Sequence, residues 1–415
     1  MSAQEISACR CCGSTALESI LSLGVQHLTG VFPKSPAERV TSGPLELVKC
    51  VSGGGCGLVQ LRHTYDSSEM YGANYGYRSG LNQSMVRHLG QTAAAIVAKY
   101  PPAPDAIVLD IGSNDGTTLS FMPEGVRRVG MDPTIVKYGK FYQPGIQKIP
   151  DFFSAKTFRA NFGNEKAAII TSIAMFYDLD DPLAFVRDIA AVLAPEGVWY
   201  FEQSYLLTML TQNAYDTICH EHLEYYALRQ IEWMMARCGL RVIDVKLNDV
   251  NGGSFSVAVC HEDADHRPDT AAIDAVRSGE RAARLDELDP YHAFAERVVA
   301  HRDALVALIA DIRSQGKRVI GYGASTKGNV ILQFCGLTSD DIPAIAEVNP
   351  DKYGAFTPGT HIPIISEAEA HALAPDYFLV MPWHFRDNLI GRETAYLASG
   401  GKMIFPLPEI SVASA

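Results

Sequence analysis

The sequence predicts an α/β protein of more than one domain, built on doubly wound sheets. Three observations predict this fold: buried-strand runs alternate with helical patterns from about residue 106 onward, a proline-rich break precedes them, and five cysteines gather near the N-terminus. With 415 residues the chain is long enough for about two to four domains of ordinary size.

The composition excludes several classes of protein. There are 47 Asp and Glu residues against 35 Lys and Arg, the net charge is −12, and no basic run could bind a phosphate polymer, so we expect no nucleic acid partner. Apolar residues make up 47% of the chain, as in globular protein, yet no apolar run reaches the ~18 residues of a membrane helix. The first residues lack the pattern of a secretory signal, so we expect a cytoplasmic location with cysteines as thiols or metal ligands.

The N-terminal cysteines predict a zinc-binding module over residues 1–80. Two cysteine pairs in one short module are typical of a tetrahedral zinc site, and the expected metal ligands are Cys9, Cys12, Cys50 and Cys56. Cys50 and Cys56 are further apart in sequence than is usual for such a pair, but the glycines between them could let the longer loop close. Cys11 would not bind the metal. The stretch between the pairs is predicted to be loop-like and too poor in apolar residues to fold without a metal. Reduced, structurally inert cysteines are the alternative.

Residues 81–265 predict a doubly wound sheet. A helix is expected over about 84–99, and Pro101-Pro-Ala-Pro104 then separates it from the first strand. Strands are predicted at 106–110, 126–131, 167–173, 198–201, 240–245 and 254–260, with helices at 182–193 and 228–238.

The rest of the chain predicts a connector and a second, smaller sheet. Residues 266–315 are polar, with Leu and Val recurring at helical spacing, and predict a helical connector. Residues 316–415 predict a Rossmann-like domain, with strands at 318–323, 342–348, 377–381 and 402–405.

The glycine-rich loop after the first strand predicts a nucleotide-like cofactor. Ligands of this kind bind at the carboxyl edge of such sheets, and Asp132 ends the next strand, where a carboxylate can hold ribose hydroxyls. Because the loop is acidic, it favours the ammonium and sulfonium of S-adenosylmethionine (SAM) over a pyrophosphate. A dinucleotide and a structural turn without ligand are the alternatives. The expected cofactor-binding residues are Asp110, Gly112, Asn114, Asp115, Gly116, Asp132, Pro133 and Phe153, the last of which could cover an adenine.

A second polar group lies between predicted strands, where His220, Glu221 and His222 follow one another. The spacing excludes the helical zinc motif H-E-x-x-H. A histidine is a natural general base near neutral pH, and a neighbouring carboxylate could orient it. A polar loop that fastens the sheet edge is the alternative. Tyr75 and Tyr77 form a further group, either as hydrogen-bond donors to a substrate oxygen or as part of the core or a lid.

The loop at 321–329 predicts a diphosphate site, because small residues, hydroxyls and a lysine stand at a strand-to-helix turn. The order of residues is not that of a Walker A motif, so ATP hydrolysis is not indicated. The expected residues are Ser325, Thr326, Lys327 and Asn329, with Glu347 after the next strand as a nucleoside contact or a simple turn.

These motifs occur in one order along nearly the whole chain: Cys9-x-x-Cys12, Cys56 to Leu61, Asp110 to Gly116, Cys219-His-Glu-His222 and Gly323 to Gly328. Together they resemble the zinc-containing sugar C-methyltransferases, which act on nucleotide-linked 4-keto deoxysugars. The resemblance implies a small N-terminal zinc-binding module, a central class I Rossmann-like SAM methyltransferase domain and a C-terminal Rossmann-like domain.

The resemblance also implies a mechanism. The 4-keto group acidifies the neighbouring C3–H, a base removes that proton, and the enolate attacks the SAM methyl. His222 matches the family's base, Glu221 would support it, and His220 would line the pocket. Tyr75 or Tyr77 would lie near the sugar, Ser325, Thr326 and Lys327 would lie near the diphosphate, and the zinc would be structural.

Other functions are also considered. An O- or N-methyltransferase acting on a nucleotide sugar would need no carbon acid. A non-catalytic nucleotide-binding zinc module would bind SAM weakly or not at all. A nucleotide-sugar dehydrogenase or epimerase would hold NAD, which the acidic loop disfavours. The expected partner is a nucleotide-linked keto-deoxysugar substrate, and the expected assembly is a monomer or small homo-oligomer.

Overall fold

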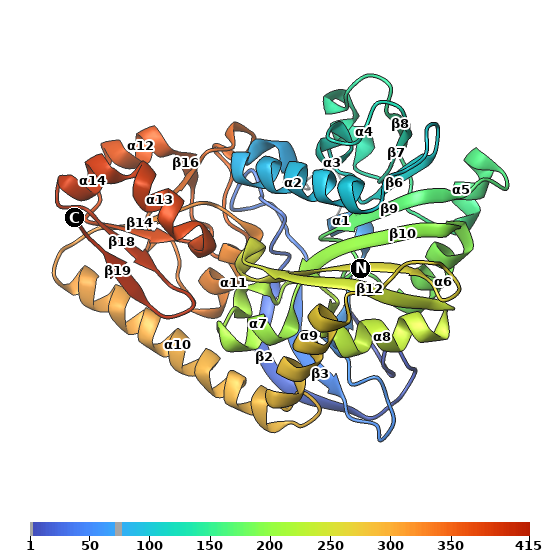
Figure 1. The fold of residues 1–415 in the computed structure, drawn as a ribbon. Coiled ribbons are helices and arrows are strands. Elements are labelled where there is room, and N and C mark those ends of the chain that lie inside the picture. The colour runs from blue at the N-terminus through green and yellow to red at the C-terminus, as the bar shows by residue number, and fades with distance from the viewer. Residues whose placement is uncertain (1–2, 71–76) are drawn as a thin grey trace.

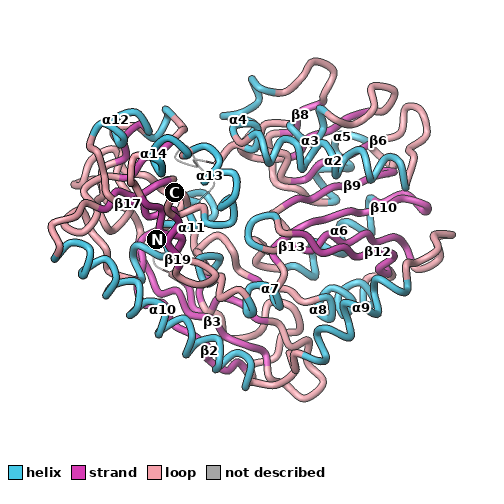
Figure 2. Tube along the Cα trace, turned by 60° about the vertical axis from the view of Figure 1, so that its left-hand side comes forward, coloured by secondary structure: helices cyan, strands magenta, loops and turns pink. Residues whose placement is uncertain are grey.

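The computed structural model describes residues 3–70 and 77–415 of the chain, so the predicted site residue Tyr75 lies outside the described residues. Three sheets of four, seven and six strands carry the fold. Figure 1 shows the seven-stranded and six-stranded sheets on opposite sides of the molecule, with the N-terminal strands beneath and between them, and Figure 2 shows the same arrangement after a turn. One continuous apolar core joins all three, since it includes Leu47, Phe201 and Phe378.

The N-terminal module is a four-stranded antiparallel sheet in the order β11-β4-β3-β2. The prediction of a loop-like stretch poor in apolar residues is wrong: Leu45, Leu47 and Val48 are almost fully buried between the cysteine pairs. The strands are β2 (Leu17–His27), β3 (Ser42–Cys50), β4 (Val59–Leu61) and the distant β11 (Glu224–Tyr225). A short pairing of β1 (Gln4–Glu5) with β5 (His63–Thr64) and helix α1 (Ser67–Met70) complete it.

The seven-stranded sheet has the order β12-β13-β10-β9-β6-β7-β8, and only β13 runs antiparallel to its neighbours. This confirms the predicted class I Rossmann-like sheet. The strands are β6 (Ile107–Ile111), β7 (Arg127–Met131), β8 (Gln147–Ile149), β9 (Ala167–Ile173), β10 (Leu193–Ser204), β12 (Leu240–Asn248) and β13 (Ser254–His261).

Helices cover both faces of this sheet (Figure 1). One face is covered by α2 (Gln83–Lys99), α3 (Thr117–Ser120) and α4 (Ile135–Tyr138), followed by the 3-10 turn η2 (Gly139–Phe141). The other face is covered by α5 (Ala155–Phe162), α6 (Pro182–Val192), α8 (Leu228–Arg237) and α9 (Thr270–Ala282). The two layers bury the central strand β6 along its whole length, as is typical of a parallel sheet, whereas the edge strands β8 and β12 are partly exposed.

The six-stranded C-terminal sheet has the order β16-β15-β14-β17-β18-β19 and is parallel except at β19. Its strands are β14 (Val319–Tyr322), β15 (Ile345–Glu347), β16 (Ile364–Ser366), β17 (Tyr377–Val380), β18 (Lys402–Phe405) and β19 (Ser411–Ala413). Its helices are α11 (Thr326–Phe334), α12 (Glu367–Ala372), α13 (Arg386–Arg392) and α14 (Thr394–Ala398).

The three sheets meet around a few short elements. The long helix α10 (Asp289–Ser314) packs against β2, α7 (Leu206–Thr211) and β14, so it braces all three parts (Figure 1). Helix α11 packs on β2 and on the turn η3 (Tyr215–Thr217), and η4 (Val250–Gly252) packs on η6 (Trp383–Phe385). The remaining turns are η1 (Ser79–Leu81) and η5 (Pro350–Lys352).

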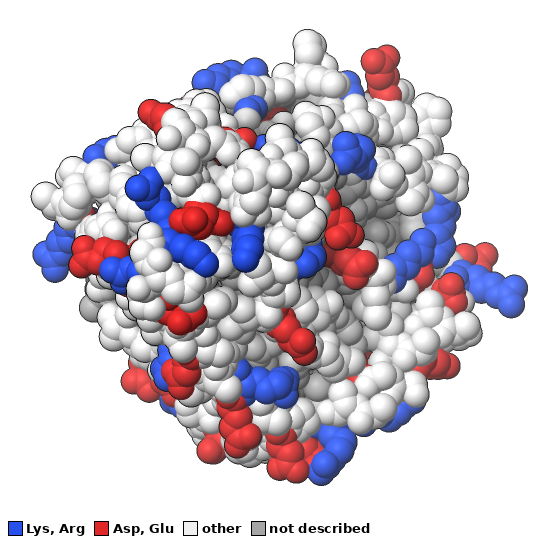
Figure 3. All heavy atoms as spheres, turned by 90° about the vertical axis from the view of Figure 1, so that its left-hand side faces the viewer, with Lys and Arg blue, Asp and Glu red and all other residues white. Residues whose placement is uncertain are grey.

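The surface carries charges of both signs. Figure 3 shows Lys and Arg side chains interspersed with Asp and Glu over the face that the C-terminal part presents, without a large region of one sign. Within residues 3–70 and 77–415, no helix combines the length and apolar character of a membrane span.

Candidate active site and zinc centre

Four cysteine sulfurs of the N-terminal module converge. The Sγ atoms of Cys9, Cys12, Cys50 and Cys56 lie within 4.8 Å of one another, and the Cys9–Cys56 and Cys12–Cys50 pairs are 3.5 Å apart. Tetrahedral zinc with Zn–S bonds of ~2.3 Å needs sulfurs roughly 3.8 Å apart, so the set fits a zinc ion. Cys11 is buried nearby and is not part of the set.

Glycines allow the long Cys50–Cys56 loop to close. A Cβ on Gly55 would lie 2.9 Å from the Cβ of Ser52 and 3.2 Å from Sγ of Cys50, so a larger residue would push the loop open. The closed loop is tied to helix α8, because Nε2 of Gln230 donates a 2.9 Å hydrogen bond to the carbonyl of Cys56. The cluster therefore links the module to the seven-stranded sheet.

A large cavity opens at the carboxyl edge of β6, β7, β9 and β10, where a Rossmann-like sheet binds its nucleotide. Most of the predicted cofactor residues line it: Asp110, Gly112, Asn114, Asp132, Pro133 and Phe153. Tyr77 also lines it and is 47% exposed. The structure thus brings these residues together.

Glycine is required where the backbone approaches this cavity. Gly112 has φ +70°, and a Cβ there would lie 2.9 Å from Cγ of Met175. The next turn is held by Asp132, whose carboxylate accepts from the backbone N–H groups of Asn114 (2.8 Å) and Thr134 (2.6 Å). Burial raises the pKa of Asp110 to about 7, with Asp132 adding to the rise. These groups give the cavity an acidic wall that suits a cationic sulfonium and ammonium.

Two predicted cofactor residues support the loop and do not line the cavity. Asp115 accepts from the backbone N–H of Gly80 at 2.9 Å and from the hydroxyl of Thr117 at 2.6 Å. Gly116 precedes α3 with φ +78°, where a Cβ would meet the ring of Tyr142 at 2.9 Å. The acidic residue that pointed to a ligand contact in the sequence instead pins η1 over the cavity.

The far side of the same cavity holds polar residues that sequence reasoning missed. Glu202 and Gln203 lie near the end of β10. Asn251 lies in the connection between β12 and β13, and Ser254 is the first residue of β13. Glu202 is held by Nε2 of His88 at 2.5 Å and by Nδ2 of Asn248 at 2.8 Å. The usable signal was the position itself: like Asp110, these polar residues end a strand that is otherwise buried.

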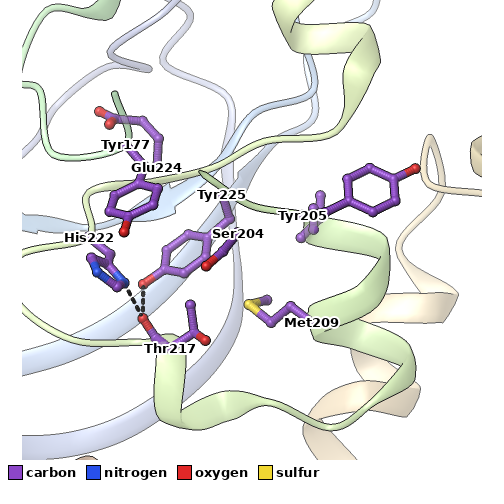
Figure 4. A pocket seen from close by; sticks show the side chains of 9 residues that line it. Tyr177, Ser204, Tyr205, Met209, Thr217, His222, Glu224 and Tyr225 are labelled. Carbon is purple, nitrogen blue, oxygen red and sulfur yellow. Dashed lines mark hydrogen bonds between the residues drawn. The ribbon is translucent and has the colours of Figure 1, made fainter. Parts of the chain in front are cut away.

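His222 lies in a second, smaller cavity, which Tyr177 and Thr217 also line (Figure 4). Its Nδ1 is 2.8 Å from the carbonyl oxygen of Thr217, which can only accept, so Nδ1 carries the proton and Nε2 has a free lone pair. The Tyr177 ring packs beside the imidazole with centroids 4.3 Å apart. Burial, followed by the positive charge of Lys327, lowers the pKa of His222 to about 3. The free imidazole is therefore neutral and can accept a proton.

The two residues before His222 lie elsewhere. Glu221 contacts the N-terminal module: the Thr29 hydroxyl donates to its carboxylate at 3.4 Å, and burial raises the pKa of this carboxyl. His220 is fully buried and packs edge-to-face with the ring of Tyr65, with the ring centroids 4.6 Å apart. Burial lowers the pKa of His220 to about 3. Among the residues that the structure describes, neither belongs to the lining of these two cavities.

Helix α11 carries Lys327 to the edge of the large cavity. Nζ of Lys327 donates to the carbonyl of Asn251 at 2.6 Å, and its charge lowers the pKa of both His222 and His384. Asp216, which is fully buried, accepts from Nε1 of Trp383 at 2.7 Å. Lys327 thus joins the C-terminal part to the edge of the large cavity.

The other predicted substrate residues are engaged within the fold. Ser325 caps α11, since its hydroxyl accepts from the N–H of Gly328 at 3.0 Å. Asn329 donates to the carbonyl of Thr29 at 2.7 Å, and Glu347 accepts from the backbone of Val348 and Asn349. Thr326 is half-buried, with its hydroxyl beside Gly30.

Comparison with known families divides the chain into three matches. A zinc binding domain family matches residues 9–71, a methyltransferase domain family matches residues 85–245, and the C-methyltransferase C-terminal domain family matches residues 249–408. Their order is the order of the three sheets.

Individual proteins are also similar. The chain is 32% identical to the C-methyltransferase NovU of Streptomyces niveus over 421 residues, which covers 99% of this chain and 97% of NovU. CalS10, an amino pentose methyltransferase from Micromonospora echinaspora involved in calicheamicin biosynthesis, overlaps 43% of this chain and 93% of its own at 16% identity and a TM-score of 0.32. The CcbJ methyltransferase from Streptomyces caelestis overlaps 42% of this chain and 89% of its own at 13% identity and a TM-score of 0.33. At such TM-scores, the two structural overlaps carry no weight for function.

The full-length match, the family matches and the geometry agree. The enzyme is a SAM-dependent methyltransferase, and its four-cysteine cluster is a zinc site. The family expected from the sequence motifs is confirmed: the chain belongs to the C-methyltransferase family of which NovU is a member.

Proposed function

We propose that this C-methyltransferase methylates C3 of a nucleotide-linked 4-keto deoxysugar through an enolate. The observation that carries the proposal is the neutral His222, with a free Nε2, within the field of Lys327 and in a cavity lined by Ser204, the residue that follows Gln203 of the cofactor cavity. A base next to a methyl donor suits carbon methylation, because a carbon acid must lose a proton before it can attack.

The proton chemistry follows from the position of the ring. A keto group acidifies the neighbouring C–H, Nε2 of His222 removes this proton, and the electron pair moves onto the keto oxygen. The imidazolium that forms is stabilised by the Thr217 carbonyl at Nδ1. SAM supplies the electrophilic methyl when bound, and the residues that would hold it are those of the acidic wall, with Asp132 at the ribose and Phe153 at the adenine.

The low pKa of His222 is that of the enzyme without bound substrate. A base works best when its pKa is near the working pH, and here burial and Lys327 hold it far below. A bound diphosphate would neutralise Lys327 and so raise the pKa of His222. The base would then become effective when the nucleotide substrate is bound.

We propose that Lys327 and Thr326 bind the diphosphate, at the start of α11. Ser325 would serve as the helix cap, and Asn329 and Glu347 would shape the site, since their side chains already bond to the backbone. Tyr77, at the mouth of the cofactor cavity, and Tyr75 would approach the sugar. Glu221 would hold the loop that presents His222, and His220 would pack beneath it.

The proposal includes the wider setting of the enzyme. The functional units would be residues 1–80, 81–265, 266–315 and 316–415, with β11 of the second unit completing the N-terminal sheet. The enzyme would act in the cytoplasm, where a reducing environment keeps four zinc-binding thiols reduced.

Incubation of the zinc-replete protein with SAM and a panel of 4-keto nucleotide sugars in deuterated water tests the proposal. We expect a methyl group on the carbon beside the ketone, and without SAM we expect enzyme-dependent deuterium exchange at that carbon. Methylation of a hydroxyl or amine without exchange would replace this function by O- or N-methylation. If no sugar in the panel undergoes either exchange or methylation, the proposed function is overturned.

A further inference from the structure

Gln203 is a buried residue of the cofactor cavity whose amide has no hydrogen-bond partner among the described residues. Its side chain is 2% exposed, yet neither Oε1 nor Nε2 has a partner among the described residues, although the residue lines the cofactor cavity. Burying an amide without partners is costly, so the fold has no structural reason to place one here.

The other buried glutamines differ from Gln203. Gln230 has both amide atoms bonded, to the carbonyl of Cys56 and to the N–H of Ala227. Gln60 accepts from Arg10, and Gln26 donates to the carbonyl of Leu23. Among the buried glutamines of the described chain, Gln203 alone has both atoms unpaired.

Gln203 precedes in sequence a residue of the His222 cavity. Its neighbour Ser204 lines the cavity of His222, whereas Gln203 lines the cofactor cavity. The cofactor residues Asp110 and Asp132 belong to β6 and the end of β7, while Gln203 lies beyond β9, on β10. Gln203 therefore lines the part of the cofactor cavity that β10 forms, on the other side of β9 from Asp110.

The lining of the cofactor cavity offers no basic side chain. Among the described residues that form it, there is no lysine, arginine or histidine, and Glu202 at the same edge is already held by His88 and Asn248. Among its lining residues, only neutral donors can therefore meet negative charge that develops on an acceptor, and preorganised donors of this kind are effective in sites that exclude water.

We propose that Nε2 of Gln203 donates a hydrogen bond to the carbonyl oxygen of the acceptor. This rests on the proposed function. When the C–H bond beside the ketone breaks, the proton goes to Nε2 of His222 and the electron pair ends on the carbonyl oxygen, where the Gln203 amide stabilises the enolate. Gln203 is then a catalytic residue of the acceptor half-site.

Gln203→Met tests this, because methionine matches the shape and lacks both polar atoms. We expect turnover and SAM-independent deuterium exchange to fall by about 100-fold, as for an oxyanion donor. SAM affinity by calorimetry should be unchanged, and the melting temperature of the ligand-free protein should stay equal or rise. Unchanged turnover, a weaker SAM affinity with normal exchange, or a lower melting temperature would each overturn the proposal.

Two further variants keep the test specific. Gln203→Glu retains the shape and the acceptor oxygens but loses the donor. At pH above neutrality it should therefore lose deuterium exchange as severely as Gln203→Met. Exchange by this variant at the wild-type rate would show that Gln203 donates no hydrogen bond in the reaction. Gln230→Met is the matched control and should lower the melting temperature, since both of its amide bonds are structural. If wild-type protein shows no exchange with any sugar, the proposed function fails, while a lowered melting temperature of Gln203→Met still decides against Gln203.

Discussion

Nε1 of Trp383 donates a 2.7 Å hydrogen bond to the buried carboxylate of Asp216, and this bond joins the C-terminal part to the segment that leads to His222. The indole is packed tightly as well, because a Cβ on Gly252 would lie 3.0 Å from its ring. Burial raises the pKa of Asp216, opposed by Lys327 and by this bond. The pair therefore fixes how the segment that precedes His222 packs against the C-terminal part.

Replacing Trp383 by phenylalanine should destabilise the protein by about 1–3 kcal/mol, because Asp216 would lose its only side-chain donor in the described structure. We also expect a higher KM for the nucleotide sugar with SAM affinity unchanged. Urea unfolding and steady-state kinetics measure both effects. Trp233→Phe, on the half-buried face of α8, is the control and should change neither by a comparable amount.

The sequence predicts the parallel sheets well and the N-terminal sheet poorly. β9 and β18 have the predicted bounds, because a mostly buried strand gives a short run rich in apolar residues. β2 and β3 do not show clean alternation, since their pairing shifts register between Ser19 and Leu21 and again between Ser22 and Val25. Such bulges break the two-residue period from which a strand is recognised.

The candidate site shows the same division between local and distant information. Local patterns point to Asp132 and His222, but that Lys327 lies within reach of His222 depends on the packing of α11 against η3, which no local pattern contains. Gln203 was missed for the same reason: its importance lies in what does not bond to it. Asp115 has the right chemistry for a ligand, yet backbone groups of its own loop and of η1 use it.

His222→Ala should lower turnover by about 100-fold or more, the scale of general-base catalysis, because the imidazole proposed to accept the proton would be lost. SAM affinity should stay near that of the wild type, since His222 does not line the cofactor cavity. Single-turnover kinetics and calorimetry measure the two quantities. Turnover within a few-fold of the wild type would remove His222 from the role of base.

His220 should make the fold sensitive to acid. Its pKa is about 3 in the folded protein and about 6.5 when unfolded, so the folded state binds fewer protons between these values. Its contribution to stability is complete above pH of about 6.5 and is lost as the pH falls toward 3, by up to ~1.4 kcal/mol per pH unit. His220→Phe should therefore reduce the loss of unfolding free energy between pH of about 7 and 5. The exposed His292→Phe is the control, and an equal effect of both variants would contradict the argument.

Zinc removal should unfold the N-terminal module first. Cys50→Ser removes one of four ligands, so we expect loss of the metal by elemental analysis and a lower melting temperature, and chelation of the wild type should do the same. Cys238→Ser is the control, because Cys238 lies at the end of α8 outside the cluster. A wild type that keeps its melting temperature after losing zinc would contradict a structural role for the metal.

Lys327→Met should separate substrate binding from cofactor binding. The proposed diphosphate contact would be lost, so KM for the nucleotide sugar should rise by at least 10-fold while SAM affinity is unchanged, a loss of about 1.4 kcal/mol or more. The positive charge of Lys327 lowers the pKa of His222, so its removal should raise that pKa in the free enzyme. The acid limb of kcat/KM should then move to higher pH than in the wild type. Lys352→Met, whose Nζ bonds to the carbonyl of Ala324, is a control for loss of a nearby positive charge. If the two variants gave the same KM and the same pH profile, the effect of Lys327 would be one of general charge, and the diphosphate contact would have to be placed elsewhere.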